Sequence, residues 1–582
     1  MTGSPLTAAA LLAAAVATVA IGAYGVRFSR TTSDFLVASR TVGPQWNAAA
    51  ISGEYLSAAS FLGVAGLIAK YGADALWYPV GFTAGYLGLL LFVAAPLRRS
   101  GAYTVPDFAE FRLGSARLRK IAMLVVVVIC IFYLVPQYQG AGLALKILLG
   151  TPVWLGPVAV GAIVITNVVA GGMRSITFVQ AFQYWLKLTA VAIPALALTG
   201  LFVSDPGGEL GAPMPPTVQQ DTVVAIETDV VVQVDDPRGL TVTGTLDGKP
   251  VDGATIAGAG EHVLSAGSTL NLAQGAAAPV VAGTPSTGSD WIASGGGLGG
   301  QHPLYQVLSI MVATFLGTMG LPHVLVRFYT NPDGRVARRT ALAVIALLSL
   351  FYIFPTLLGV FSRLYVPRLL ITGNADAAVL LAPSSAIDGV AGQLLAALVA
   401  AGAIAAFLAT SSGLLVSFAG ALATDVLPGR VRDFRLAAVL GGLIPIPLAL
   451  AASGGLELSR SVGLAFAVAA STLCPLLVLG IWWRGLTARG AAWGLAVGGL
   501  LSGVAVTVAV AGGVAEDVLA GWPAVMIGYP AAVSVPLAFA TMIIVSRLTR
   551  ADVPSDVAQT FARMHVPENL GMGIERMPRG QS

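Results

Sequence analysis

Long apolar runs separated by short polar connections occupy most of the chain. A helix needs about 20 residues to cross the hydrocarbon core of a bilayer, and each run reaches or approaches that length. The pattern predicts 13 membrane-spanning helices with approximate limits 5–26, 45–70, 75–97, 119–149, 154–172, 179–203, 305–328, 338–367, 390–425, 434–453, 460–482, 489–512 and 522–547. Several runs exceed 20 residues, so tilted or broken helices are expected.

The distribution of basic residues supports this number of spans. The odd-numbered connections and the tail carry arginines, among them Arg27, Arg30, Arg98, Arg99, Arg174, Arg338, Arg339, Arg430, Arg432, Arg484 and Arg547. The even-numbered connections are poor in bases. Because cytoplasmic loops are enriched in Lys and Arg, the alternation predicts an external N-terminus and a cytoplasmic C-terminus. No basic residue precedes Arg27, so the first run is expected to be a retained helix rather than a signal peptide.

One connection, about residues 204–304, is different in character. From 205 to 302 it holds 11 acidic residues and two basic ones. Val230–Val234 and Leu240–Leu246 are typical of strands, with a turn between them, and Asp247-Gly248 offers a second turn. We expect a small extracytoplasmic β-rich domain, with a disordered loop as the alternative. Gly295–Gly300 is expected to be a flexible linker.

The composition excludes several classes of protein. The chain is 56% hydrophobic and 10% charged, whereas a soluble domain is about 25% charged. The net charge of +4 belongs to short loops, so it indicates membrane topology rather than nucleic-acid binding. The two cysteines lie in apolar runs and the four histidines lack ligand spacing, which argues against a disulfide framework or a metal centre. No nucleophile–base pair that would indicate an enzyme occurs in the spans.

The second span contains polar and small residues where a uniformly apolar helix is expected. Its sequence from Ile51 to Gly63 is ISGEYLSAASFLG. A carboxylate such as Glu54 costs at least about 2.5–3.5 kcal/mol at the centre of a membrane, so it usually marks a functional site. Gly53 favours unwinding of the helix, which would free carbonyl oxygens for a cation and turn a half-helix N-terminus toward an anion. A small-residue packing face is the alternative.

The ninth span carries three consecutive hydroxyl residues, Thr410 to Ser412. Hydroxyls in a membrane helix can bond back to carbonyls one turn earlier. They can also act as ligands for a hard cation, and Ala406 shares a helix face with Thr410. Asp425 ends this span and is expected to lie at the cytoplasmic interface.

Several segments resemble the sodium/solute symporter family. They are Asp34–Arg40, Thr104–Phe108, Gly171–Thr177 and Gly317–Tyr329, and the resemblance covers nearly the whole chain except the insert and the tail. Ser57–Gly63 and the Gly-Leu-Pro-His run at 320–323 are similar to the acetate and monocarboxylate permease branch.

The resemblance implies a LeuT-like core of ten helices, formed by two inverted repeats of five. The chain would then divide into a first helix and loop (1–44), the first repeat with spans 2–6 (45–203) and the insert (204–304). The second repeat with spans 7–11 (305–483), spans 12–13 (484–549) and a polar, partly disordered cytoplasmic tail (550–582) would follow. The first helix of each repeat is expected to break, at Gly53 and at Gly317–Gly320, where glycines and Pro322 suit a break.

The resemblance also implies a sodium site between spans 2 and 9, with no other cofactor. Its positions fall on Gly53, Leu56, Ala406, Ala409 and Thr410, and alanine replaces the usual hydroxyl residue at Ala409. A proton is the alternative coupling ion, with Glu54 as its carrier.

The expected substrate is a small monocarboxylate. Trp77–Leu91 in the third span has no carboxylate or amide, and a small anion needs few polar contacts. The candidate substrate-binding residues are Tyr55, Ser60, Gln137 and Thr318, although each could instead serve packing or capping. Lys187 could attract the anion or extend to the cytoplasmic surface.

These patterns predict a secondary transporter of a bacterial inner membrane that imports a monocarboxylate such as acetate with sodium. Another organic solute, such as pyruvate, propionate or an amino acid, is the alternative. A solute sensor that binds an external partner through the insert is the alternative of a different class.

Overall fold

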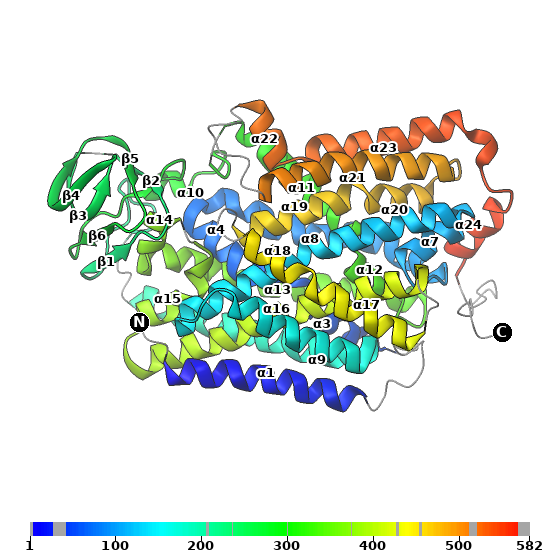
Figure 1. Cartoon of the computed structure of the whole chain (residues 1–582), viewed down its shortest axis with the longest axis horizontal. Coiled ribbons are helices and arrows are strands. Elements are labelled where there is room, and N and C mark those ends of the chain that lie inside the picture. Colours follow the sequence, from blue (N-terminus) through cyan, green and yellow to red (C-terminus); the bar gives the residue numbers. More distant parts are fainter. Residues whose placement is uncertain are drawn as a thin grey trace.

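A computed structural model describes residues 4–26, 42–204, 209–235, 237–299, 301–373, 375–426, 430–452, 457–510 and 521–567. Within these ranges the chain forms a bundle of helices with a small β-sheet at one end (Figure 1). The similarity segment Asp34–Arg40, most of the first predicted connection (27–41) and the end of the C-terminal tail (568–582) lie outside the described residues.

The helices of the first half begin with α1 (Pro5–Val26), which lies along the outside of the bundle (Figure 1). They continue with α3 (Pro44–Tyr55), α4 (Val64–Tyr71), α5 (Trp77–Gly88), α6 (Ala94–Arg99), α7 (Val105–Leu113), α8 (Ala116–Leu149) and α9 (Leu155–Ser204). Ala59–Gly63, between α3 and α4, forms a π-helical turn.

The second half begins with α11 (Pro303–Gly320), α12 (Pro322–Phe328) and α13 (Gly334–Tyr365). It continues with α14 (Arg368–Thr372), α15 (Ala378–Ala386), α16 (Gly389–Asp425), α17 (Val431–Leu443), α18 (Pro445–Ala451), α19 (Leu458–Ser471), α20 (Leu473–Trp482), α21 (Ala488–Val510), α22 (Trp522–Gly528), α23 (Ala531–Leu548) and α24 (Val557–His565). Almost all of α16 from Ala396 to Ala423 is buried, so this helix runs through the centre of the bundle.

The described residues contain 11 helical stretches long and apolar enough to cross a membrane, against 13 predicted spans. Two of these stretches, Ala59–Arg99 and Leu155–Ser204, each cover parts of two predicted spans. Both are interrupted: Gly72 has a φ of 66°, and Gly172 has a φ of 57° with a ψ of −160°. The chain is therefore a multi-pass membrane protein, and the number of crossings stays a prediction.

The sheet is built from β1 (Thr222–Ala225), β2 (Val230–Val234), β3 (Arg238–Leu246), β4 (Lys249–Ala257), β5 (Gly260–Leu264), β6 (Thr269–Leu272) and β7 (Val280–Val281). All pairs are antiparallel, in the order β1-β6-β3-β5-β2-β7, with β4 on β3. The two expected strands are present, but they do not pair with each other. The turn at Asp247-Gly248 does join a hairpin, because Leu246 pairs with Lys249.

Buried residues alternate along the strands, as in Val232 and Val234, and the sheet core includes Ile371 of α14. The glycine segment after the sheet is fixed rather than free, in contrast to the expected flexible linker. The Gly295 and Gly297 amides donate to the Asp74 carboxylate, the latter at 2.7 Å. The short helix α10 (Gly288–Ile292) also anchors this region, because the Trp291 indole donates to Ile68 O at 2.7 Å. The sheet is thus attached to the helices at both Ile371 and Trp291.

The C-terminal segment packs at the opposite end of the bundle from the sheet (Figure 1). In α24, Phe561 and Met564 are buried, and His565 Nε2 lies 2.9 Å from Ile481 O. The part of the tail from 557 to 565 is therefore ordered.

Candidate functional site

The helix of the second predicted span breaks after Tyr55. α3 ends there, Leu56 leaves helical geometry with φ −72° and ψ 85°, and a π-helical turn starts at Ala59. The break therefore lies three residues after the predicted position, Gly53, which is itself helical. Gly53 instead permits close packing on α9, because a Cβ there would lie 2.1 Å from Gln180 O.

A second break separates α11 from α12. Leu321 is extended, with φ −71° and ψ 118°, and Pro322 begins the next helix. The expected break at Gly317–Gly320 thus falls at the C-terminal limit of that segment. A Cβ at Gly320 would lie 2.5 Å from Ala469 O, so this glycine also lets the chain approach α19 closely.

The carbonyls at the end of α3 receive hydrogen bonds from side chains. Helix termini leave the last carbonyls without intrahelical donors, so buried ends need other partners. Lys187 of α9 donates its ammonium to Gly53 O, and to Leu56 O at 2.7 Å. Thr410 of α16 donates to Glu54 O at 2.6 Å. Lys187 is fully buried, so it neither extends to the surface nor reaches solvent.

The five predicted sodium positions contribute unequally to this cluster. The carbonyl oxygens of Gly53 and Leu56 both accept hydrogen bonds from Lys187. Thr410 donates a hydrogen bond to the neighbouring carbonyl oxygen of Glu54. Ala409 O accepts a hydrogen bond from Gln180 Nε2 at 2.8 Å, and Ala406 is buried one helical turn before Thr410. Two of the expected carbonyl ligands already carry a cationic partner. A second cation about 4 Å from an ammonium would be repelled by roughly 4 kcal/mol at an effective dielectric constant of 20. The residues as arranged therefore do not fit sodium at these oxygens.

Glu54 forms a buried ion pair that the sequence did not reveal. Arg327 Nε, from α12, lies 2.6 Å from Glu54 Oε2, and both side chains are only 1% exposed. Arg327 also donates to Thr177 Oγ1 at 2.8 Å and to Gln180 Oε1. A Cβ at Gly413 would lie 1.8 Å from Glu54 Oε1, so this glycine makes room for the carboxylate. The pair connects both broken helices to α9, because Glu54 belongs to α3 and Arg327 of α12 also bonds to Thr177 and Gln180 of α9.

The four candidate substrate residues all lie near the breaks. The Tyr55 hydroxyl donates to Phe82 O at 3.0 Å and lies 2.8 Å from Thr318 Oγ1. Gln137 Oε1 accepts from Ala58 N at 3.0 Å, directly at the first break. Ser60 Oγ lies 2.9 Å from the Tyr352 hydroxyl. The structure therefore brings Tyr55 and Thr318 together, places Gln137 at the unwound segment, and pairs Ser60 with α13.

Aromatic rings surround the first break. The rings of Tyr55 and Tyr86 are edge-to-face at 4.9 Å, and Phe466 packs against Phe82 at the same distance. Tyr133 contacts both Phe466 and His323. Among the described residues, the Tyr86 hydroxyl, Gln137 Nε2 and both His323 ring nitrogens are buried without a hydrogen-bond partner. Buried polar atoms are normally paired, so these groups could bind a polar ligand.

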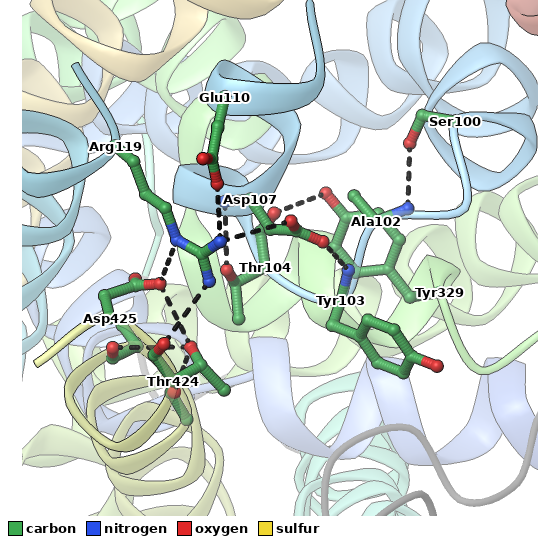
Figure 2. Close-up of polar contacts among 12 residues, drawn as sticks. Ser100, Ala102, Tyr103, Thr104, Asp107, Glu110, Arg119, Tyr329, Thr424 and Asp425 are labelled. Carbon is green, nitrogen blue, oxygen red and sulfur yellow. Dashed lines mark hydrogen bonds and ion pairs between the residues drawn. The ribbon is translucent and has the colours of Figure 1, made fainter. Parts of the chain in front are cut away.

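An ion-pair cluster joins the helices at the end of the bundle that holds α24. Figure 2 shows Arg119 of α8 between Glu110 and Asp425. Its Nη1 lies 2.7 Å from Glu110 Oε2, and its Nε contacts Asp425 Oδ1. Asp425, expected at the interface, thus ties the end of α16 to α7 and α8.

The family model of the sodium:solute symporter family matches residues 35–205 and 276–498. The chain is 31% identical to a monocarboxylic acid transporter of Corynebacterium glutamicum over 95% of this chain and 93% of that protein. It is 30% identical to the uncharacterized symporter YwcA of Bacillus subtilis over 96% of this chain and 97% of that protein.

Among solved structures, the fold is similar to that of a sodium-coupled sialic acid symporter in a substrate-bound, outward-open state. The TM-score is 0.59 at 15% identity, covering 94% of this chain and 98% of the other. That likeness concerns the fold alone. From the matched family model and the two relatives, we conclude that this chain is a multi-pass membrane transporter, not an enzyme, and belongs to the sodium:solute symporter family.

Proposed function

We propose that the chain imports a small monocarboxylate such as acetate, coupled to the inward movement of a cation. The observation that carries the proposal is the arrangement at the first break. Gln137 Oε1 accepts from the Ala58 amide at the unwound backbone. Tyr86 packs against Tyr55 and His323 against Tyr133, and polar atoms of Gln137, Tyr86 and His323 are buried without a partner among the described residues. The monocarboxylic acid transporter among the relatives supports the same class of substrate.

The chemistry of this arrangement suits a short carboxylate. A carboxylate accepts hydrogen bonds only, and Gln137 Nε2 and the Tyr86 hydroxyl are donors. The Arg327 guanidinium is engaged by Glu54, Thr177 and Gln180, so the anion does not depend on it. Aromatic rings such as Tyr55, Tyr86 and Tyr133 offer apolar contact for a short carbon chain, which suits acetate, propionate or pyruvate.

The family match and the sodium-coupled neighbour support sodium as the coupling ion, bound elsewhere than at the Gly53 and Leu56 oxygens that Lys187 occupies, with the proton as the alternative. For proton coupling we propose Glu54 as the carrier. Its ion pair with Arg327 also holds α3 against α12. Coupling requires that cation and carboxylate favour the same conformation, since a ligand with equal affinity for two states shifts neither.

Transport by alternating access would involve both breaks, because each joins two half-helices that can change their mutual angle. The bacterial relatives support a location in the bacterial cell membrane. The alternation of basic connections supports an orientation with the sheet outside and the C-terminus inside. The sheet and α24 lie at opposite ends of the bundle, as that orientation requires (Figure 1).

Competition for uptake tests the substrate class. The purified chain in proteoliposomes should take up labelled acetate, and unlabelled propionate and pyruvate should compete. Proline should not compete, because it also carries a positive charge. Among the described residues, the carboxylate at the break is Glu54, which is already paired with Arg327. Competition by proline with no effect of propionate would replace the monocarboxylate with an amino acid.

The sensor alternative depends on the insert. The match to the family model omits residues 206–275, which hold six of the seven strands. An external partner bound there remains a separate proposal, and a variant without the sheet tests it.

A further inference from the structure

Lys187 occupies the position expected for a metal cation. It extends from the middle of α9 and donates to Gly53 O and Leu56 O, carbonyls three residues apart at the end of α3. Lysine in a membrane helix usually extends its ammonium to the lipid–water interface. Here the side chain is 0% exposed and points into the bundle, so its ammonium is committed to these oxygens.

The unpaired carbonyls at the end of α3 explain why the Lys187 nitrogen lies there. The C-terminus of a helix carries a partial negative charge, and its last carbonyls need donors. An ammonium is a compact charge with three donors and can satisfy several carbonyls at once. The oxygens of Gly53 and Leu56 therefore make a ready site for one positive charge.

The charges of the neighbouring side chains favour only one unpaired cation at these oxygens. Besides Lys187, the acidic and basic side chains of the described residues that lie at this cluster are Glu54 and Arg327, which form an ion pair. With Lys187 charged, the buried cluster carries one net positive charge. Sodium added beside it would raise this to two, at the cost of burying an unpaired charge. Sodium in place of Lys187 would restore the same net charge.

We infer that the Lys187 ammonium is the resident cation at these oxygens, and that sodium does not bind there while Lys187 is present. The inference deepens the proposed function by assigning the expected cation site to a side chain of the protein itself. Only the role of the site in coupling rests on the proposed function. Whether sodium binds at these oxygens can be measured without transport.

Thermal unfolding of the full chain in lipid nanodiscs tests the inference. Melting temperatures are measured in sodium, potassium and choline chloride at equal ionic strength, for wild type and Lys187→Ala. Removing the ammonium opens the two carbonyls, so sodium should raise the melting temperature of Lys187→Ala by about 2–4 °C more than that of wild type. Potassium and choline should not.

Two further variants serve as controls. Lys187→Arg keeps a cation and should show no gain in sodium response. Lys146→Ala removes a lysine that pairs with Glu227 at the sheet, away from the site, and should behave as wild type. If Lys187→Ala does not fold, Lys187→Met keeps most of the apolar stem and is measured in the same way.

An equal sodium response in wild type and in the variant would overturn the inference, as would a response in wild type that the variant loses. Failure of the proposed function would look different. It would appear as absent uptake of acetate by wild type, whatever the melting temperatures show.

Discussion

At the scale of single residues, the buried polar groups around the first break decide the chemistry. Gln137 is the clearest of them, because its oxygen accepts from the Ala58 amide and its nitrogen has no partner among the described residues. The sequence pointed to Gln137, Tyr55 and Thr318 only as polar side chains in apolar helices. It could not show Lys187 or Arg327 at this site, because their partners are more than 100 positions away.

Replacement of Gln137 by alanine should weaken substrate binding. We expect the half-saturation concentration for acetate to rise about tenfold, which corresponds to one lost hydrogen bond to a charged group. Uptake kinetics in proteoliposomes provide the measurement. Gln139→Ala is the matched control on the same helix, since Gln139 donates to Ala452 O at 2.8 Å, away from the break. Equal half-saturation in wild type and Gln137→Ala would remove Gln137 from the site.

The Glu54–Arg327 pair should be a strong determinant of stability. Removing one partner leaves a buried charge uncompensated, so Glu54→Gln and Arg327→Gln should each cost about 3–5 kcal/mol of unfolding free energy. The double variant should cost less than the sum, because the two residues are coupled. Chemical denaturation in detergent measures these losses of unfolding free energy. The exposed pair Lys146–Glu227 serves as the comparison and should contribute less than about 1 kcal/mol. Additive losses would show that the pair is not coupled.

At the scale of elements, the two broken helices are the feature that positions the site. The sequence predicted that both helices break, and the second break falls at the edge of the predicted segment. The first break lies at Leu56 rather than at the predicted Gly53. A glycine in the sequence is compatible both with an unwound helix and with close packing against a neighbouring helix, so it does not distinguish the two. Here Gly53 serves packing, and the carbonyls beyond it are stabilised by Lys187 and Thr410.

Alanine at Gly53 should damage the protein by overpacking. Its Cβ would lie 2.1 Å from the backbone oxygen of Gln180, which cannot move without shifting α9. We expect a loss of about 1–3 kcal/mol and reduced uptake. Gly503→Ala is the control, because a Cβ there meets nothing within 4 Å and the helix should be unchanged or gain stability. Unaltered melting in Gly53→Ala would contradict the close approach of α3 and α9.

At the scale of the whole molecule, the chain combines a helical bundle with a sheet that is attached to it at Ile371 and Trp291. Apolar runs and the alternation of basic loops predicted a multi-pass helical protein, because a bilayer requires long internally bonded helices. Of the seven strands in the insert, β2 and β3 were also predicted from their β-branched residues, whereas the other strands and the strand pairing were not. Pairing depends on contacts such as Val232 with His262, which local sequence does not encode.

Removal of the sheet should leave transport intact. Ala278 N donates to Pro216 O at 2.9 Å, so the ends of segment 217–277 lie together and a Gly-Gly link can replace it. We expect uptake of acetate within about twofold of wild type, because the remaining loop is still anchored. Trp291→Ala is the contrasting variant, since it removes a contact with α4 and should lower the melting temperature. Loss of uptake in a well-folded deletion variant would assign the sheet a part in transport.

The most direct test of cation-coupled import is the accumulation of labelled acetate in proteoliposomes with sodium and proton gradients imposed separately. Our account predicts that at least one inward cation gradient drives acetate above its equilibrium level, and that collapsing this gradient abolishes accumulation. Uptake that only equilibrates acetate across the membrane under every gradient would contradict it.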